Sequence, residues 1–338
     1  MNVLVNGIGN IGTTLLNLLI DFKEDLGIST IYALKKNKVD VWNQDELQLL
    51  NERGIVLCSE TNNSFKPLSE VIDRIDYIFD CNANGMGLKN KSWYESLTHV
   101  KGFSSQGSEK GFGIPFMSNV NNNEIQNQRF VQIVSCNTHS LSTIIQTLTN
   151  NNLNDLISGD FVVVRRSEDI GNHQRLVSAN VVSRHMQNDV GTHHAIDVKD
   201  LFETKGIHLN LQSSDITTPS QLMHTVRFSL KMKEKFDIEK MTQRLTENPY
   251  IATTSKFDSN VIFELGRRYS RYGRLYSHAI LNWNNLLIDE KENMVKGWAF
   301  IPQEGNSLLS TIHAFLLQTG QDSNKISSLQ ESLLRKIW

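Results

Sequence analysis

The chain has 338 residues, and its 34 lysines and arginines against 36 aspartates and glutamates give a net charge of −2. This balance argues against a protein that coats nucleic acid or binds an anionic membrane, because both need surplus positive charge. The composition, 39% hydrophobic and 21% charged, is typical of a globular chain of about two domains. No apolar run approaches the ~20 residues that span a bilayer, and the N-terminus has no signal-peptide pattern. We therefore expect a cytoplasmic protein without a nucleic-acid or membrane partner.

The first 135 residues alternate between short apolar segments and amphipathic segments. Leucine spacing predicts a helix over residues 13–26, after a buried strand at residues 3–5. Further strands are expected at residues 28–34, 76–80 and 130–135. Strands that alternate with helices indicate βαβ units and a parallel sheet.

The pattern changes after about residue 150, where apolar and polar residues alternate as in half-buried antiparallel strands. This alternation marks residues 161–164, residues 226–233 and a predicted hairpin over residues 284–301. Asp237 is placed to cap a helix that ends near residue 246. Helical spacing returns at residues 308–317 and 326–338. The sequence therefore predicts an α/β chain with a doubly wound parallel sheet, followed by an α+β domain with a mixed or antiparallel sheet.

A glycine-rich turn follows the first strand directly. Residues 7–12 have the pattern G-x-G-x-x-G, and they open the first predicted helix. In such a loop Gly7 would allow a tight turn, Gly9 a close approach of the backbone to a pyrophosphate, and Gly12 close packing of helix on strand. The helix N-terminus adds unpaired N–H groups and a partial positive charge. We therefore predict a dinucleotide site here.

The end of the second strand bears on which dinucleotide is bound. An NAD site usually carries a carboxylate about 20 residues after the glycines, whereas the first carboxylate here is Asp40. Lys35 and Lys36 precede it, and their charges would attract the 2′-phosphate of NADP. We predict NADP as the preferred cofactor, with NAD as the second choice. A solvated basic loop is the alternative interpretation of the two lysines.

The three cysteines, Cys58, Cys81 and Cys136, are too few and too scattered for a disulfide framework or a zinc site, so no metal is predicted. Cys58 and Cys81 are expected to be small buried side chains. Cys136 follows a buried strand and precedes a helical segment that starts near residue 140. A helix N-terminus stabilises a thiolate and lowers the pKa of the thiol. Such a thiolate can attack an aldehyde, form a thiohemiacetal, lose hydride to a nicotinamide and become a thioester.

This chemistry also needs a base near the sulfur and a pocket for an anionic substrate. Four of the ten histidines are candidates for the base, namely His139, His193, His194 and His224. For each of them a core or surface histidine is the alternative interpretation. Arg165 and Arg166 are candidates for a phosphate-binding fork, although paired arginines at a sheet edge also serve structural roles.

An ordered set of motifs resembles the archaeal-type (type II) glyceraldehyde-3-phosphate dehydrogenases. The motifs are the glycine loop, Asp80 with residues 84–87, residues 106–110, residues 134–138 around Cys136, residues 164–166, His193 with His194, residues 222–224, and Gln303 with Glu304. The resemblance implies a Rossmann domain that binds NAD(P) over residues 1–137 and a catalytic domain over residues 138–302. It also implies a C-terminal helical segment, residues 303–338, that packs back on the Rossmann domain, and a homotetramer.

The same resemblance implies roles for single residues. Cys136 would be the nucleophile, and His224 the base that activates it and takes up the proton as hydride leaves. The full set of expected cofactor residues, which includes the glycines and lysines above, is Gly7, Gly9, Asn10, Ile11, Gly12, Lys35, Lys36, Gly107, Ser108, Arg166 and Gln303. The residues expected to bind substrate and phosphate are Ser135, Asn137, Thr138, Arg165, His193 and His194.

Family members oxidise glyceraldehyde 3-phosphate with inorganic phosphate to 1,3-bisphosphoglycerate, reversibly, in glycolysis and gluconeogenesis, and the resemblance implies the same reaction here. Several features depart from the family, among them Ser108, which stands where a second glycine is usual, and residues 172–176, which replace a Gly-Pro loop. Two alternatives therefore stay open. One is a related cysteine-dependent semialdehyde or acyl-phosphate reductase, whose substrate carries a carboxylate. The other is a non-catalytic NADP-binding redox sensor with Cys136 as its reactive thiol.

Overall fold

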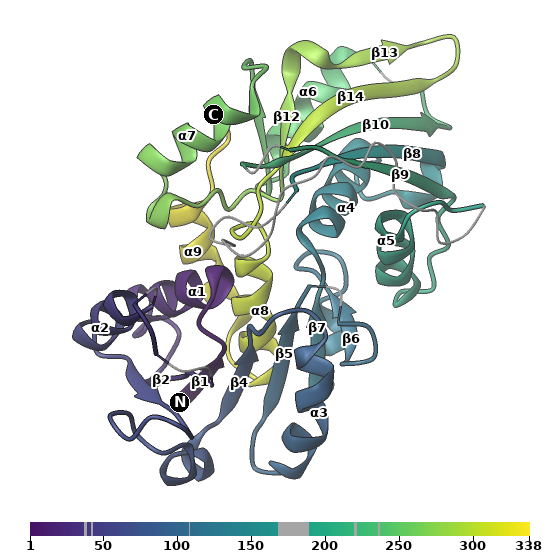
Figure 1. The fold of residues 1–338 in the computed structure, drawn as a ribbon. Helices are drawn as coiled ribbons and strands as arrows, with labels where there is room; N and C mark the ends of the chain where they lie inside the picture. The colour runs from purple at the N-terminus through teal and green to yellow at the C-terminus, as the bar shows by residue number, and fades with distance from the viewer. Residues whose placement is uncertain (37–38, 42, 108, 168–188, 220–221, 236) are drawn as a thin grey trace. The chain divides into compact units, whose positions relative to one another are not determined.

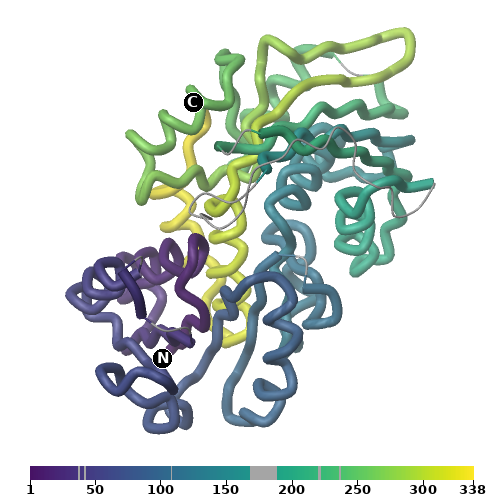
Figure 2. Tube along the Cα trace, viewed as in Figure 1, coloured from purple at the N-terminus to yellow at the C-terminus, as the bar shows by residue number. Residues whose placement is uncertain are grey.

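The computed structural model describes residues 1–36, 39–41, 43–107, 109–167, 189–219, 222–235 and 237–338. These residues form two compact units, and Figure 2 traces the chain through both. Unit 1 comprises Met1–Ile133 and Leu308–Leu329, and unit 2 comprises Val134–Ser307 and Gln330–Trp338. Within the described part of the chain, no helix combines the length and the apolar character that a membrane crossing requires.

Unit 1 is built on a parallel sheet whose described strands follow the order β3-β2-β1-β4-β5-β7-β6 (Figure 1). The strands are β1 Asn2–Asn6, β2 Thr30–Leu34, β3 Val56–Cys58, β4 Tyr77–Asp80, β5 Gly102–Gln106, β6 Ile114–Phe116 and β7 Phe130–Ile133. The chain continues from β1 to β2 on one side and returns to β4 on the other, so the strand order reverses between β1 and β4. Open α/β sheets bind ligands beyond the carboxyl ends of their strands at such a point.

Helices cover both faces of this sheet. The helices of unit 1 are α1 Asn10–Asp21, α2 Gln44–Glu52, α3 Met86–Ser96 and α8 Leu308–Gln318, and α9 Ile326–Leu333 ends in unit 2. Tyr77 and Phe79 of β4 contact Phe315 of α8, with ring centroids 5.1 and 5.7 Å apart. Ile78 between them belongs to the same buried cluster as Tyr94 of α3. Because successive residues of a strand point to opposite faces, α3 and α8 lie on opposite faces.

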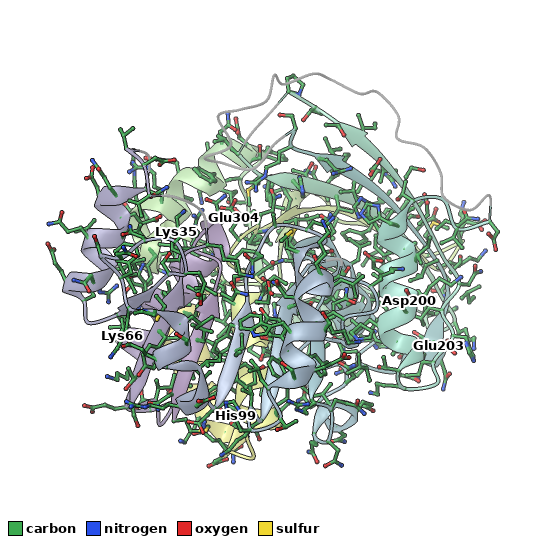
Figure 3. The ribbon with its side chains drawn as sticks, turned by 60° about the horizontal axis from the view of Figure 1, so that its bottom comes forward. Lys35, Lys66, His99, Asp200, Glu203 and Glu304 are labelled. Carbon is green, nitrogen blue, oxygen red and sulfur yellow. The ribbon has the colours of Figure 1, made fainter. Side chains whose placement is uncertain are left out.

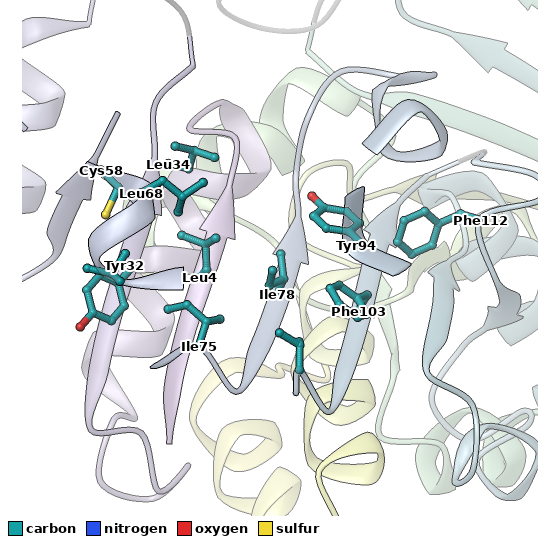
Figure 4. Packing of buried hydrophobic residues seen from close by; sticks show 12 residues of the cluster. Leu4, Tyr32, Leu34, Cys58, Leu68, Ile75, Ile78, Tyr94, Phe103 and Phe112 are labelled. Carbon is teal, nitrogen blue, oxygen red and sulfur yellow. The ribbon is translucent and has the colours of Figure 1, made fainter. Parts of the chain in front are cut away.

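The cluster on the α3 face runs across several strands (Figure 4). Leu4, Ile78 and Phe103 lie in it on β1, β4 and β5, and each is fully buried. Tyr94 stacks on Phe103 with ring centroids 5.0 Å apart. Burial of each such side chain contributes about 1.5–3 kcal/mol, so this apolar layer holds the central strands, and the loops at their carboxyl ends, in register.

Unit 2 is built on a mixed sheet in the order β11-β12-β14-β10-β8-β9, and β13 pairs with β14. The strands are β8 Leu156–Arg165, β9 Leu211–Thr217, β10 His224–Met232, β11 Ile251–Thr254, β12 Ala279–Asn282, β13 Leu287–Asp289 and β14 Met294–Ile301, and the helices are α4 Cys136–Leu148, α5 His193–Glu203, α6 Ile238–Glu247 and α7 Ser259–Tyr269. β10 runs antiparallel to both β8 and β14, whereas β8 and β9 are parallel.

The predicted fold class is confirmed, since a parallel sheet and a second, mixed sheet make an α/β chain. The predicted hairpin is also confirmed as β13 and β14. Asp237 caps α6 as expected, and its side chain accepts a hydrogen bond from the Lys240 N–H at 2.8 Å.

Three predicted helices have wrong limits. The first helix begins at Asn10 and ends at Asp21, and irregular turns lead to Gly27. α4 begins at Cys136 instead of residue 140, because Ser135 caps it. α9 ends at Leu333 instead of residue 338, because the chain end pairs with β11, where the Trp338 N–H donates to the Thr253 carbonyl at 3.0 Å.

Candidate active site

The glycine turn of unit 1 has the geometry of a phosphate cradle. Gly7 has a φ of +107°, and a Cβ there would lie 2.8 Å from the carbonyl carbon of Cys81. A Cβ on Gly12 would lie 2.0 Å from the Gly7 carbonyl oxygen. A Cβ on Gly9, the N-cap of α1, would have no described atom within 4 Å. The first and third glycines therefore serve close packing, and the second leaves the backbone open to a ligand.

A hollow of about 170 Å³ lies beside this turn. It is lined by Gly7, Ile8, Gly9, Leu34, Lys35, Lys36, Cys81, Asn82 and Ala83. These residues follow β1, β2 and β4, at the point where the strand order reverses. The volume is below the ~300 Å³ of a pocket that encloses a whole ligand, so the hollow suits one part of a dinucleotide. Open backbone, a helix N-terminus and two lysines fit its phosphates.

The two lysines of the hollow have different surroundings. The Lys36 Nζ donates to Asn90 Oδ1 at 2.9 Å and lies 5.4 Å from the centroid of the Trp93 ring. Burial lowers the pKa of Lys36, and the charge of Asp80 partly opposes this. Lys35 (labelled in Figure 3) binds the Cys58 carbonyl through its main-chain N–H at 2.9 Å, and its ammonium makes no hydrogen bond or ion pair with a described residue. Lys35 is thus the lysine with a charge available to a ligand.

A buried carboxylate organises the loop that packs against Gly7. Asp80 at the end of β4 accepts hydrogen bonds from the Tyr94 hydroxyl at 2.5 Å and the Asn90 amide at 2.7 Å. Its other oxygen accepts from the main-chain N–H and the side chain of Asn82, both at 3.0 Å. These bonds hold residues 81–82 where a Cβ on Gly7 would meet them.

The remaining expected cofactor residues of unit 1 are less informative. Asn10 and Ile11 form the first turn of α1. Gly107 has a φ of +76°, its N–H donates to the Ile133 carbonyl at 2.9 Å, and its carbonyl accepts from the Gln132 side chain at 2.9 Å. Ser108 lies outside the described residues.

In unit 2, Cys136 is the first residue of α4, a buried helix of 13 residues. Ser135 caps the helix, since its Oγ accepts from the Thr138 N–H at 3.3 Å and lies 2.9 Å from the Thr138 Oγ1. Asn306 donates to the Cys136 carbonyl at 3.0 Å and to the His278 carbonyl at 3.1 Å. The half-buried thiol is therefore held at the positive end of a fixed helix, which favours the thiolate.

The other two thiols differ from Cys136. Burial raises the pKa of Cys58 to about 11, and it raises the pKa of Cys81 further. Cys58 is buried, as predicted, whereas Cys81 is only half-buried. Both thiols stay protonated near neutral pH.

His224 opens β10 and is held at both ring nitrogens. Its Nδ1 accepts from the Arg166 main-chain N–H at 2.8 Å. Its own main-chain N–H donates to Gln303 Oε1 at 3.0 Å, and the Gln303 amide nitrogen lies 2.8 Å from its Nε2. Burial, then the charges of Arg166, Arg165 and His194, lower the pKa of His224 well below its usual value, and Asp215 opposes them. The imidazole is neutral near pH 7.

A second polar network starts at Asn137, directly after Cys136. The Asn137 amide lies 3.3 Å from His194 Nδ1, His194 Nε2 lies 3.1 Å from Asp215 Oδ2, and Arg165 lies 3.4 Å from the same oxygen. The ring of His193 stacks obliquely on His194 at 4.0 Å. This network joins α4, α5, β8 and β9.

His193, His194 and Asp215 also place their nitrogen and oxygen ligand atoms within 4.8 Å of one another, close enough for a metal ion. Arg165 is paired with Asp215, however, and its positive charge disfavours a cation there. Within the described residues the cluster is better explained as a hydrogen-bonded network.

Arg166, an expected cofactor residue, places its guanidinium against Glu304. The two side chains are buried, and Nη2 lies 2.8 Å from Glu304 Oε1. Arg274 pairs with the other carboxylate oxygen of Glu304, which is labelled in Figure 3.

Unit 2 thus contains many of the expected residues, namely Ser135, Cys136, Asn137, Thr138, Arg165, Arg166, His193, His194, His224 and Gln303. One network links Asn137, His194 and Arg165 through Asp215, and another links Arg166, His224 and Gln303. Three features are not predicted from the sequence: Asp215 in the first network, Glu304 as a partner of Arg166, and the contact between Gln303 and His224. A signal for Asp215 was present, because it shares the inward face of β9 with Leu211 and Ser213, and a carboxylate there needs a partner. Residues 172–176 lie outside the described residues.

No protein-family model matches the chain. It is similar to archaeal proteins named glyceraldehyde-3-phosphate dehydrogenase. Identity to the Methanobacterium bryantii protein is 27% over 186 residues, which is 54% of this chain and 52% of the relative. Identity to the Saccharolobus solfataricus protein is 25% over 280 residues, with 78% and 76% covered. Identity to the Thermococcus kodakarensis protein is 26% over 299 residues, with 83% and 80% covered.

The chain therefore spans about half the length of the first of these relatives and three quarters or more of the other two. The similarity supports an oxidoreductase related to the glyceraldehyde-3-phosphate dehydrogenases.

Proposed function

We propose that the protein is a phosphorylating glyceraldehyde-3-phosphate dehydrogenase that prefers NADP and also accepts NAD. One observation carries the proposal: Cys136 stands at the N-terminus of α4, and the next residue is hydrogen-bonded into a network with His194, Asp215 and Arg165. A thiol in this position, in the same compact unit as a neutral, buried His224, suits nucleophilic attack on an aldehyde.

The first step is addition of the Cys136 thiolate to the aldehyde carbon of the substrate. A carbon–sulfur bond forms, and the carbonyl π electrons move to oxygen. The helix N-terminus stabilises the thiolate before attack. His224 would be the base that activates the thiol and takes up the proton as hydride leaves. The Arg165 cation and the ring N–H donors of the histidine pair suit the substrate phosphate.

The second step is oxidation of the tetrahedral adduct to a thioester. Hydride leaves the former aldehyde carbon with its electron pair, and the carbon–oxygen double bond re-forms. NADP, when bound, supplies the nicotinamide that accepts this hydride. The residues that would hold it are Gly7, Gly9, Gly12, Asn10 and Ile11 at the pyrophosphate, with Lys35 at the 2′-phosphate.

The third step releases the product and restores the thiolate. An oxygen of inorganic phosphate attacks the thioester carbon, the carbon–sulfur bond breaks, and 1,3-bisphosphoglycerate leaves. All steps are reversible, so the enzyme would serve glycolysis or gluconeogenesis. We further propose a cytoplasmic homotetramer whose partners are small molecules.

The test is formation of NADPH from glyceraldehyde 3-phosphate with and without inorganic phosphate, repeated with NAD. We expect turnover that depends on phosphate and is faster with NADP. Cys136→Ser should abolish it, whereas the matched variant Cys58→Ser, at a buried thiol outside the site, should retain it. Full activity of Cys136→Ser would refute the mechanism. Faster turnover of aspartate semialdehyde would instead favour a related semialdehyde dehydrogenase.

A further inference from the structure

The turn that follows β14, residues 302–306, binds several other segments of unit 2. Its main chain closes on itself, with the Asn306 N–H 3.4 Å from the Pro302 carbonyl oxygen. Three of its side chains reach outward: Gln303 contacts His224, Glu304 pairs with Arg166 and Arg274, and Asn306 donates to the Cys136 carbonyl. One short segment therefore touches the helix that carries the thiol, a candidate base and two arginines, all within unit 2.

The main chain of this turn is strained at Glu304. Its φ is +62°, and the other described non-glycine residues with a positive φ are Tyr272 and four asparagines. Asparagine tolerates the left-handed region, whereas glutamate enters it only at a cost in free energy. The next residue, Gly305, is packed so closely that a Cβ would lie 2.1 Å from the Leu275 carbonyl oxygen. The turn keeps an unfavourable conformation, so contacts with other segments must hold it.

Two arginines supply such contacts. Arg166 Nη2 lies 2.8 Å from Glu304 Oε1, and Arg274 Nη1 lies 2.5 Å from Oε2, so each carboxylate oxygen has its own arginine. The side chains of Arg166 and Glu304 are only 3% and 7% exposed. Hydrogen bonds between charged groups are short and strong where water is excluded. An asparagine would suit the main chain better, but it has neither the charge nor a second oxygen for the second arginine.

Asn306 connects the turn to the peptide group that follows the thiol. Its side chain is fully buried, and the amide nitrogen lies 3.0 Å from the Cys136 carbonyl oxygen and 3.1 Å from that of His278. A hydrogen bond to the Cys136 carbonyl polarises the peptide group that it shares with Asn137. The N–H of this peptide group lies at the start of α4, where main-chain N–H groups have no partner within the helix. Polarisation therefore strengthens the positive end that favours a thiolate.

We propose that Glu304 is a positioning residue for the Cys136 thiol. Arg166 and Arg274 hold its main chain in the strained conformation. The turn then places the Asn306 amide on the Cys136 peptide group, and this favours the thiolate. The proposal rests on the proposed function for one point, the use of Cys136 as a nucleophile. Its test measures the thiol itself and needs neither substrate nor cofactor, so the two can fail separately.

The rate at which iodoacetamide alkylates Cys136 reports the thiolate. The full-length protein is used, the modified peptide is identified by mass spectrometry, and the rate is followed from pH 5 to pH 9. Glu304→Asp keeps the charge and tolerates a positive φ, but its side chain is one methylene shorter and cannot span both arginines. We expect alkylation about tenfold slower than in the wild-type protein at pH 6, with the pH profile displaced upward. A rate equal to the wild type or faster would mean that the turn needs only a tolerant residue, and would overturn the proposal.

A second variant tests the route through Asn306. Asn306→Leu has a side chain of similar size without a donor, and it should also slow alkylation about tenfold at pH 6. If both residues act on the same peptide group, their effects do not add. We therefore expect Glu304→Asp combined with Asn306→Leu to remain about tenfold slower than the wild type. A loss of about a hundredfold would show two independent effects, against the proposal.

Glu264 provides the matched control, because its carboxylate also pairs with two arginines, Arg267 and Arg268. It lies on α7 in the same unit, and its side chain is 36% exposed. Glu264→Asp should leave alkylation unchanged. Slower alkylation in this variant would show that the thiol responds to any altered arginine pair in unit 2, and would contradict a specific role for Glu304.

Arg274→Lys is a milder variant, which keeps the test open if Glu304→Asp does not fold. The residue is half-buried, and lysine keeps the charge but lacks the planar fork of arginine. We expect alkylation about threefold slower at pH 6, and an unchanged rate would overturn the proposal. If the alkylation rates follow these expectations but the wild-type protein does not turn over the aldehyde, the proposed function alone is refuted.

Discussion

The glycine turn of unit 1 and the cysteine–histidine site of unit 2 are built in different ways. The turn is one contiguous segment whose main-chain atoms pack closely together and face the ligand site. A Cβ at Gly7 or Gly12 would overlap other main-chain atoms. The site of unit 2 joins side chains from α4, α5, β8, β9 and β10 through buried hydrogen bonds. The first depends on the absence of side chains, and the second depends on their polar groups being matched.

This difference teaches where each site is vulnerable. An added methyl group should damage the turn, whereas a side-chain change nearby should alter only ligand preference. In unit 2, replacement of one polar group leaves another one buried without its partner, which costs about 1–3 kcal/mol and shifts the protonation of neighbours. An added methyl group in the glycine turn should therefore act mainly on the stability of unit 1. Replacement of one polar side chain by another of similar size in unit 2 should act mainly on turnover.

The largest effect is expected for Gly12→Ala. Its Cβ would lie 2.0 Å from the Gly7 carbonyl oxygen, so α1 must move away from β1. We expect a loss of about 3 kcal/mol or more in the free energy of unfolding, measured by urea denaturation. Gly9→Ala is the matched control, because no described atom lies within 4 Å of its Cβ. It should leave stability nearly unchanged and weaken NADP binding, and equal destabilisation by the two changes would contradict the packing argument.

The same contrast explains which features the sequence could predict. The G-x-G-x-x-G motif and the Asp237 cap are local patterns, so a few neighbouring residues specify them. Ser135, followed by the Thr138 N–H it caps, was also a local signal for the start of α4, although apolar spacing alone placed that start four residues later. The end of α9 depends on pairing with β11, a contact between distant segments.

The hydrogen-bonded networks of unit 2 were harder to predict for the same reason. Cys136, His194 and His224 could be named from their motifs, but their hydrogen-bond partners lie far away in the chain. Gln303 is 79 residues from His224, and nothing in its neighbourhood indicates that contact. Propensity and periodicity describe how one element folds, whereas side-chain matching depends on which elements pack together.

The next largest effect is expected from acid, which should lower the stability of the two units to different extents. Burial lowers the pKa of His139 to about 4, and burial lowers the pKa values of His224 and His278 well below their usual value, all in unit 2. Among the described histidines of unit 1, burial lowers the pKa of His313 to about 4. An unfolded chain protonates these rings near pH 6.5, so their stabilising contribution is complete above that pH and is lost as pH falls toward 4.

Unit 2 should therefore lose more stability than unit 1 between pH 7 and pH 5. Hydrogen exchange followed by mass spectrometry measures this directly, with peptides from α4 and β12 compared to peptides from α1 and β1. Because intrinsic amide exchange slows on acidification, the rates are compared as protection factors, and we expect protection to decrease more in unit 2 than in unit 1. His139→Gln should reduce that decrease, since it removes one ring that protonates on unfolding. An equal or larger effect in unit 1 would show that the buried histidines do not control the acid response.

The smallest effect sharpens the comparison inside unit 1, where Lys35 and Lys36 border one hollow but differ in their bonds. The Lys36 ammonium is already bound to Asn90 beside Asp80, whereas Lys35 has its charge available. Lys35→Ala should weaken NADP binding about tenfold, or about 1.4 kcal/mol, and leave NAD binding almost unchanged, because only NADP carries the 2′-phosphate. Lys36→Ala should weaken both cofactors to a similar, smaller extent through the Asp80 network. Titration of both nucleotides into both variants by calorimetry measures these affinities. A selective loss of NADP binding in Lys36→Ala alone would show that Lys36, not Lys35, binds the 2′-phosphate.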